Sequence, residues 1–340
     1  MIYRNCLLLL LILITGSFAG LHAQKGSDPS SITFLLENDY FGFSDRHYTS
    51  GLRLSWLSGD YTPDQVPAFW RKIDQAIPFW RDLDTPAKNF GFAIGQHIYT
   101  PENLNTAQIL KNEHPYAGWL YLEGALHKKN QNHLNSLQLS VGVIGPASLG
   151  EPTQKIIHSF LESTPPKGWH NQLKNEPTLL LTYEHHRRIS LYQKPLCFDA
   201  IPHSQINIGN VRTDLAVGAI LRGGLWLPHD FGPNTITLNS YNHNSLHLKD
   251  GQEKRQTLCL YGFVGVTARL VARNIFLDGN TFVDSHRVHK IPYTGELRFG
   301  FVFLWHNIEL SYTQTVKSYE FYGQRYGNDW YGSISVSVSL

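Results

Sequence analysis

The sequence predicts an all-β protein, a 12-stranded antiparallel transmembrane β-barrel, and three observations support this prediction. Hydrophobic residues alternate with small or polar residues in about twelve segments, each near the roughly 9–11 residues that a tilted membrane strand needs. Aromatic residues are plentiful, with 17 Tyr, 18 Phe and 8 Trp, as in the interfacial belts of membrane barrels. The chain also ends on a strictly alternating segment, residues 334–340, which has Ser on one face. A soluble β-sandwich could share this composition, so the alternation carries the prediction.

The N-terminus predicts export. Arg4 supplies a positive charge, residues 7–14 are apolar, and residues 21–23 resemble a small-residue cleavage site. We therefore expect a signal peptide over 1–23 and a single outer-membrane barrel domain over 24–340. The rest of the sequence has no run of about 18 apolar residues, so no transmembrane helix is predicted there.

The expected strands follow one another with turn-forming residues between them. They lie near 31–38, 47–58, 89–99, 115–127, 134–144, 172–187, 201–211, 213–226, 256–271, 292–304, 307–319 and 330–340. An even number of antiparallel strands places both termini on the periplasmic side. By this parity Asn38, Asp39, Thr49 and the segment after the fifth strand all fall at the outer, extracellular end.

Two connections are long for the periplasmic side. In residues 59–88, Val66, Phe69, Trp70 and Ile73 keep helical spacing, which fits an amphipathic helix on the inner leaflet or packing against the barrel mouth. Residues 227–255 are rich in Asn, His and Ser and predict an irregular segment.

A short helix is predicted within residues 145–158, against the barrel wall at the extracellular end. Pro152 near its start, or Ser148 with Glu151 as a capping box, supports a helix here. Gln154 and His158 are four residues apart and share one face. Imidazole is the natural proton acceptor for water at neutral pH, although a histidine beside an apolar helix face is more often a satisfied interfacial residue.

Composition and motifs exclude several classes. A formal charge of +2 implies no general affinity for nucleic acid. No Gly-x-Ser-x-Gly elbow is present, which argues against a serine hydrolase. In the exported chain Cys197 and Cys259 are either bonded or free, since spacing alone does not decide geometry.

Further polar residues cluster near the first two strands. Asn38-Asp39 follows a strand, which most often signals an Asx-type turn, and Asp45-Arg46 most often forms an exposed loop ion pair. Taken singly, these residues point to turn chemistry rather than to catalysis.

The ordered set of motifs resembles the outer-membrane lipid A 3'-O-deacylase family over nearly the whole exported chain. The matching residues are Asn38-Asp39, Asp45-Arg46, Tyr48-Thr49-Ser50-Gly51, Gly95-Gln96, Ile98-Tyr99-Thr100-Pro101, Pro115-Tyr116-Ala117-Gly118-Trp119-Leu120, Gly145-Pro146, Gln154, His158, Gly168-Trp169, Gln172-Leu173, Leu277-Asp278-Gly279-Asn280 and Glu320-Phe321. The resemblance implies a twelve-stranded barrel with a helix against its inner wall. It also implies hydrolysis of the ester that holds the 3'-acyloxyacyl chain on lipid A.

The same resemblance implies a mechanism in which a histidine activates water and calcium forms the oxyanion site. His158 matches the family histidine, Asn38, Asp39 and Thr49 match polar active-site residues, and Gln154 matches a glutamine one turn before the histidine. Oxygen donors such as Asn38 and Asp39 suit Ca²⁺.

Two positions depart from the family pattern. The glutamate that some members carry six residues after the histidine is Thr164 here, so Glu162 is the candidate that completes the metal site. His114 replaces the Arg of the usual Asp-Arg-Pro-Tyr-Ala-Gly run.

The resulting hypothesis is a monomeric outer-membrane esterase acting on lipid A or lipopolysaccharide among outer-membrane lipids. His158 is the base, Asp39 and Asn38 bind calcium, and Thr49 and Gln154 position water or substrate. Arg46, Arg53 and Lys155 are candidates for lipid A phosphates, or simply surface or lumen charges. The alternatives are a non-catalytic channel or surface-binding barrel, whose helix plugs the lumen, and a phospholipid hydrolase.

Overall fold

The architecture comes from a computed structural model, which describes residues 30–42, 46–61, 71–72, 75, 87–161, 164–192, 196–233, 258–325 and 327–340. The expected signal peptide and most of the segments 59–88 and 227–255 lie outside the described residues. So does Glu162.

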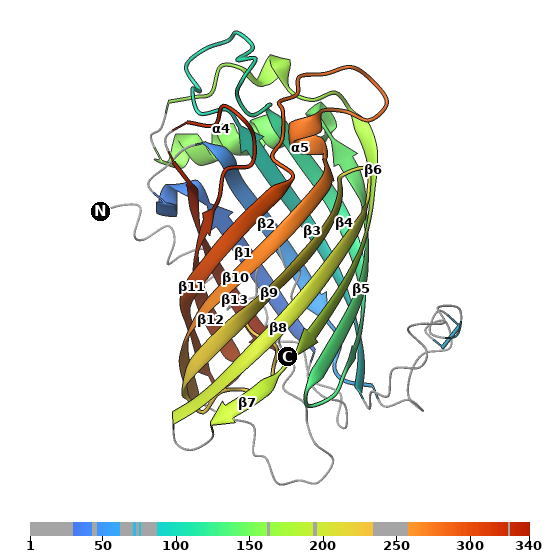
Figure 1. Cartoon of the computed structure of the whole chain (residues 1–340), viewed down its shortest axis with the longest axis vertical. Helices are drawn as coiled ribbons and strands as arrows, with labels where there is room; N and C mark the ends of the chain where they lie inside the picture. The colour runs from blue at the N-terminus through green and yellow to red at the C-terminus, as the bar shows by residue number, and fades with distance from the viewer. Residues whose placement is uncertain are drawn as a thin grey trace.

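Twelve long antiparallel strands close into a barrel, as the alternation predicts (Figure 1). They are β1 (Ser31–Asn38), β2 (His47–Leu57), β3 (Ala87–Thr100), β4 (Ala117–Lys129), β5 (His133–Ile144), β6 (Glu176–Arg187), β8 (Leu196–Gly209), β9 (Arg212–Leu225), β10 (Leu258–Asn274), β11 (Tyr293–Trp305), β12 (Ile308–Lys317) and β13 (Asp329–Ser339). The first strand pairs with the last, and β6 pairs with β8. A short extra strand, β7 (Ile189–Tyr192), pairs only with β8 among the described residues.

Side-chain alternation gives the barrel a polar interior and an apolar exterior. Leu54, Phe92 and Leu122 are exposed on the outside, where they meet lipid. The serines of the last strand face the interior, where Ser333 donates to Glu37 at 2.9 Å. Because side chains alternate between the two faces of a strand, one residue known to point inward shows which other residues of that strand point outward.

The helix α4 (Gly150–Leu161) lies at the end of the barrel where β1 ends and β2 begins (Figure 1). A Cβ built on Gly118 of β4 would lie 3.0 Å from the Cα of Gly150. The next residue, Trp119, faces the interior pocket, so Gly118 and the helix lie on the outward face. The expected position against the inner wall is therefore wrong, because the polar helix face packs on the outside of β3 and β4.

The start of the helix also differs from the expected capping box. Ser148 belongs to a 3₁₀ turn, η2 (Pro146–Ser148), and its hydroxyl donates to the Gly145 carbonyl at 2.6 Å. Leu149 then takes a left-handed conformation with φ 61°. This turn reverses the chain after β5 and directs α4 back over the neighbouring strands.

Other short elements cover the same end of the barrel. They are η1 (Asp39–Gly42), η3 (Trp169–Asn171) and α5 (Ile275–Asp278). Phe276 of α5 stacks on Tyr99 with ring centroids 4.1 Å apart, which fills the mouth from inside. No described helix is long and apolar enough to span a membrane. Both Cys197 and Cys259 are free thiols.

Candidate functional site

Strand register aligns the predicted polar residues along one rim. Asn38 of β1 pairs with Ser50 of β2, and Ser50 pairs with Ile98 of β3. Ile98 pairs with Gly118 of β4, whose carbonyl accepts from the Gly145 amide just after β5. Five consecutive strands thus reach this level of the barrel, and α4 contacts two of them, β3 and β4.

Helix α4 is long enough to extend beyond the strands that it contacts. The helix starts beyond the end of β5 and contacts β4 and β3. A helix of 12 residues extends about 18 Å at a rise of about 1.5 Å per residue. That length spans several strands at a spacing of about 4.8 Å. His158 lies in the C-terminal half of α4, the half farther from the end of β5.

The buried stripe of α4 is polar rather than apolar. Gly150, Gln154 and His158 are spaced four apart, and Gln154 and His158 are only 1% and 4% exposed. Ile156, on another face, is 57% exposed. A helix that only covers a barrel wall would bury its apolar face instead. The inverted pattern marks the space between α4 and the wall as a candidate active site.

A backbone contact fixes the tautomer of His158. Its Nδ1 lies 2.9 Å from the carbonyl oxygen of Thr164. Because a carbonyl only accepts, Nδ1 must carry the hydrogen, and in the neutral ring Nε2 then has the lone pair. Thr164 therefore contributes a ring-orienting contact through its main chain.

Asn38 and Asp39 lie at the junction of β1 and η1, and both are buried. Asn38 Oδ1 accepts from the Tyr40 amide at 2.8 Å, which is the predicted Asx turn. Asp39 Oδ2 accepts from the Arg46 amide at 2.8 Å. The turn geometry thus holds two oxygen-bearing side chains at the rim. The same residues can therefore form an Asx turn and still offer oxygen atoms to a ligand.

Thr49 occupies an irregularity in the β2–β3 ladder. The register steps from the pair Tyr48–Tyr99 to the pair Ser50–Ile98, so Thr49 is the extra residue of a bulge. Its hydroxyl lies 2.7 Å from the hydroxyl of Thr100. Thr100 has the same parity as outward Ile98, so both hydroxyls lie on the face that α4 covers.

The three predicted phosphate ligands occupy different places. Lys155 is half-exposed on α4 and pairs with Glu151 at 2.6 Å. Arg46 is partly buried at the rim, 3.4 Å from Asp329 and 3.6 Å from Glu102.

Arg53 is the exception, because it lies inside the lumen and donates to Glu123 at 2.6 Å. Of the alternatives predicted for Arg53, this position is that of a lumen charge, because strand parity turns its side chain away from the membrane.

The oxygen atoms at the rim are of the type that binds a hard cation. Asn38 and Asp39 offer amide and carboxylate oxygens, the ligand types that calcium takes. Among the described residues no group of three or more His, Cys, Asp or Glu side chains has the geometry to hold a metal. A site here would need main-chain oxygens, water, or Glu162, which lies outside the described residues.

Comparison with known proteins connects this arrangement to a family. The model of the family described as "Outer membrane protein LpxR" matches residues 7–340. The chain belongs to the LpxR family. The resemblance inferred from the ordered motifs is thereby confirmed.

The first of two similar solved structures agrees on the fold. LpxR from Salmonella typhimurium superposes with a TM-score of 0.71 at 19% identity, covering 91% of this chain and 100% of that one. The β domain of the Bordetella autotransporter BrkA gives a TM-score of 0.43 at 10% identity, covering 92% and 100% of the two chains. The search of curated proteins returned no match.

One departure from the LpxR family pattern changes the charge near the rim. His114, in the loop between β3 and β4, is buried and stacks on Tyr99 at 5.2 Å. Burial lowers the pKa of His114 to about 3, and the nearby His47 ring acts in the same direction. A neutral imidazole thus stands where the family pattern has a guanidinium cation.

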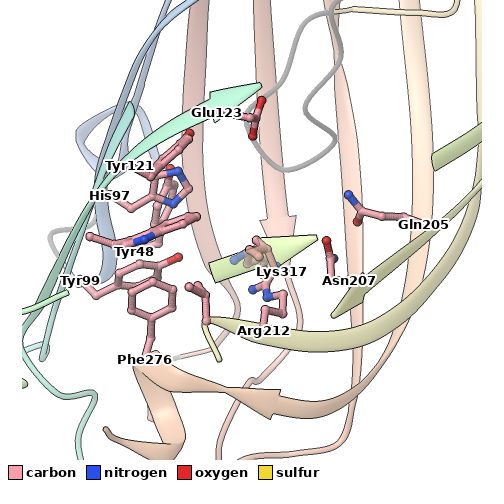
Figure 2. Close-up of a pocket in the computed structure, with 13 residues that line it drawn as sticks. Tyr48, His97, Tyr99, Tyr121, Glu123, Gln205, Asn207, Arg212, Phe276 and Lys317 are labelled. Atoms are coloured by element: carbon pink, nitrogen blue, oxygen red, sulfur yellow. The ribbon is translucent and has the colours of Figure 1, made fainter. Parts of the chain in front are cut away.

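A pocket that none of the motifs indicates lies inside the barrel, just below the mouth. Figure 2 shows an aromatic wall with Tyr48, Tyr99 and Tyr121 opposite Lys317 and Arg212. The rings pack closely, since Trp119 and Tyr121 stack with centroids 4.2 Å apart. Inward parity of alternate aromatic residues in β3 and β4 could have revealed this wall from the sequence. The pocket lies on the opposite side of the barrel wall from α4.

Proposed function

We propose that this protein is an outer-membrane esterase that removes the 3'-O-linked acyloxyacyl chain of lipid A. Membership of the LpxR family and the likeness to Salmonella LpxR support a lipid A deacylase role. The position of the bond, the histidine base and the calcium ion are our own extension of that role. We also propose that the protein acts as a monomer.

The observation that carries the proposal is the polar stripe between α4 and the outward barrel wall. Gln154 and His158 are buried there, and the facing wall carries the Thr49–Thr100 hydroxyl pair. A site on the outside of the barrel is accessible to a lipid that diffuses laterally in the outer leaflet. A solute crossing the lumen would not reach it.

In the proposed reaction, Nε2 of His158 takes a proton from a water molecule. The resulting hydroxide oxygen forms a bond to the ester carbonyl carbon. The tetrahedral intermediate then collapses, and the bond between the carbonyl carbon and the sugar oxygen breaks. His158 returns its proton to that oxygen, which gives a fatty acid and a free sugar hydroxyl.

Asn38 and Asp39 are the proposed calcium ligands, with Glu162 as a third candidate. Bound calcium would supply positive charge that offsets the negative charge developing on the carbonyl oxygen. The Thr49 hydroxyl, held by Thr100, orients water or substrate beside His158. Arg46 and Lys155 remain the candidates for the lipid A phosphates.

The decisive experiment is mass spectrometry of lipid A from cells that express the protein, with and without a calcium chelator. We expect loss of an acyloxyacyl mass only when calcium is available. The His158→Gln variant should leave lipid A intact, and the His170→Gln variant is the matched control, since His170 is exposed on η3. Retained activity in His158→Gln would contradict the proposed base.

Two alternatives make different predictions. The version of the channel in which α4 plugs the lumen is wrong, because α4 packs outside the wall. A channel of another kind would give conductance in planar bilayers and leave lipid A unchanged. A phospholipid hydrolase would release fatty acid from phospholipid vesicles that contain no lipid A.

A further inference from the structure

One residue outside the proposed catalytic set controls the orientation of Gln154. The indole Nε1 of Trp169, in η3, lies 2.7 Å from Oε1 of Gln154. An indole N–H only donates, so the amide atom facing it must be the carbonyl oxygen. The contact therefore decides which end of the Gln154 amide points toward the site.

The opposite end of that amide is a buried donor. Nε2 of Gln154 is fully buried and has no hydrogen-bond partner among the described residues. Buried amide groups are normally satisfied, and exceptions concentrate at functional sites. Gln154 shares its helix face with His158, one turn away, so this NH₂ group belongs to the same buried helix face as the proposed base.

Trp169 itself is held firmly in place. It is 1% exposed and packs with Ile98, Leu104 and Tyr116 on the outward face of the barrel. A Cβ on Gly150 would lie 3.0 Å from its ring, so α4 and the indole are in direct contact. A rigid donor on the wall side can preorganise a side chain of the helix.

We propose that Trp169 is a positioning residue which locks Gln154 so that Nε2 donates to the carbonyl oxygen of the scissile ester. This inference rests on the proposed esterase function and extends it. Gln154 becomes a second stabiliser of the oxyanion beside the proposed cation, and Trp169 acts through it without contacting substrate. A donor aimed at the developing charge accelerates the reaction without strengthening substrate binding.

Two substitutions separate the two roles. Gln154→Glu retains an oxygen that accepts from Trp169 but removes the NH₂ donor, and kcat should fall about 10²-fold with KM nearly unchanged. Trp169→Phe retains most of the ring but frees the amide to rotate, and kcat should fall about tenfold. Trp305→Phe, on the exposed end of β11, is the control for losing an indole.

A double-mutant cycle distinguishes a positioning role of Trp169 from a merely structural one. If Trp169 acts through Gln154, adding Trp169→Phe to Gln154→Glu should cost little further activity. Full additivity of the two effects, or a change in KM alone, would overturn the inference. Heat-modifiable migration of each variant checks that the barrel has folded.

Failure of this inference is distinguishable from failure of the proposed function. If the wild-type protein does not deacylate lipid A, the function itself is wrong. If the wild type is active and Gln154→Glu keeps its kcat, the ester is cleaved without this donor and only the inference is rejected.

Discussion

Close packing of α4 on the wall predicts that one methyl group on β4 disables the site. In Gly118→Ala, the new Cβ would lie 2.2 Å from the Ser148 hydroxyl and 3.0 Å from the Gly150 Cα. The hydroxyl can rotate away, but the Gly150 backbone cannot, so α4 must move outward by several tenths of an ångström or more. Misplacement of catalytic groups by about 1 Å can cost about 10²-fold in rate. We expect deacylation to fall by about that factor.

The same substitution should leave the barrel intact. Gly118 lies at the rim and its outward face meets only η2 and the start of α4 among the contacts of its added Cβ. The matched control is Gly124→Ala on the same strand, where the nearest atom to the added Cβ is 4.0 Å away. Kinetics on lipid A and heat-modifiable migration test both variants. Equal activity of Gly118→Ala and Gly124→Ala would refute the claim that the α4–wall spacing controls catalysis.

Three further predictions concern single groups. Thr49→Val removes the hydroxyl that bonds to the facing threonine of β3, and kcat should fall roughly tenfold without loss of folding. Arg222→Met leaves the buried carboxylate of Asp230 without its guanidinium and leaves Asp199 with the more distant Arg188 at 3.6 Å, which should lower the free energy of unfolding by about 3–5 kcal/mol in a denaturant titration. For His114, the folded pKa of about 3 lies below the unfolded value of about 6.5, so the unfolded state binds more protons and stability falls as pH drops below about 6.5. At pH 5 the resulting loss in the free energy of unfolding is about 2 kcal/mol. His114→Phe should therefore weaken the pH dependence of stability measured by denaturation.

The strands were predictable because alternation is a local signal. Each of the twelve expected segments overlaps one long strand, and the terminal segment 334–340 falls within or beside β13. A strand in a membrane barrel meets lipid on one face and a polar interior on the other, so its pattern is strict. The short strand β7 was missed because four residues are too few to show a period.

The rim residues were predictable in position but not in contact. Strand parity correctly placed Asn38, Thr49 and the helix at one end of the barrel. It did not reveal that α4 folds back over the outward face, because this depends on the left-handed Leu149 and on the close approach of Gly118 and Gly150. For Arg53 the sequence left a phosphate ligand and a lumen charge open, and the face assigned by the strand register favours the lumen charge.

The contact between Trp169 and Gln154 could not be predicted from the sequence. The two residues lie 15 positions apart, and their contact depends on how the segment after α4 returns to the wall. Nothing in local spacing shows that an indole will meet an amide oxygen. In the proposed mechanism, only the tertiary arrangement makes this i, i+4 pair an oriented donor and base.

The placement of the site outside the lumen explains why the barrel can be filled. The interior carries ion pairs such as Arg53–Glu123 and Arg222–Asp199, together with the packed rings below the mouth. These contacts stabilise the barrel and would obstruct a solute path, at no cost to a reaction on the membrane side. The division of labour also explains the helix. Gln154 and His158 are buried against the wall while Ile156 is exposed, which is the pattern expected if the proposed reaction takes place between helix and wall. In that proposal a lipid substrate enters between helix and wall without leaving the bilayer.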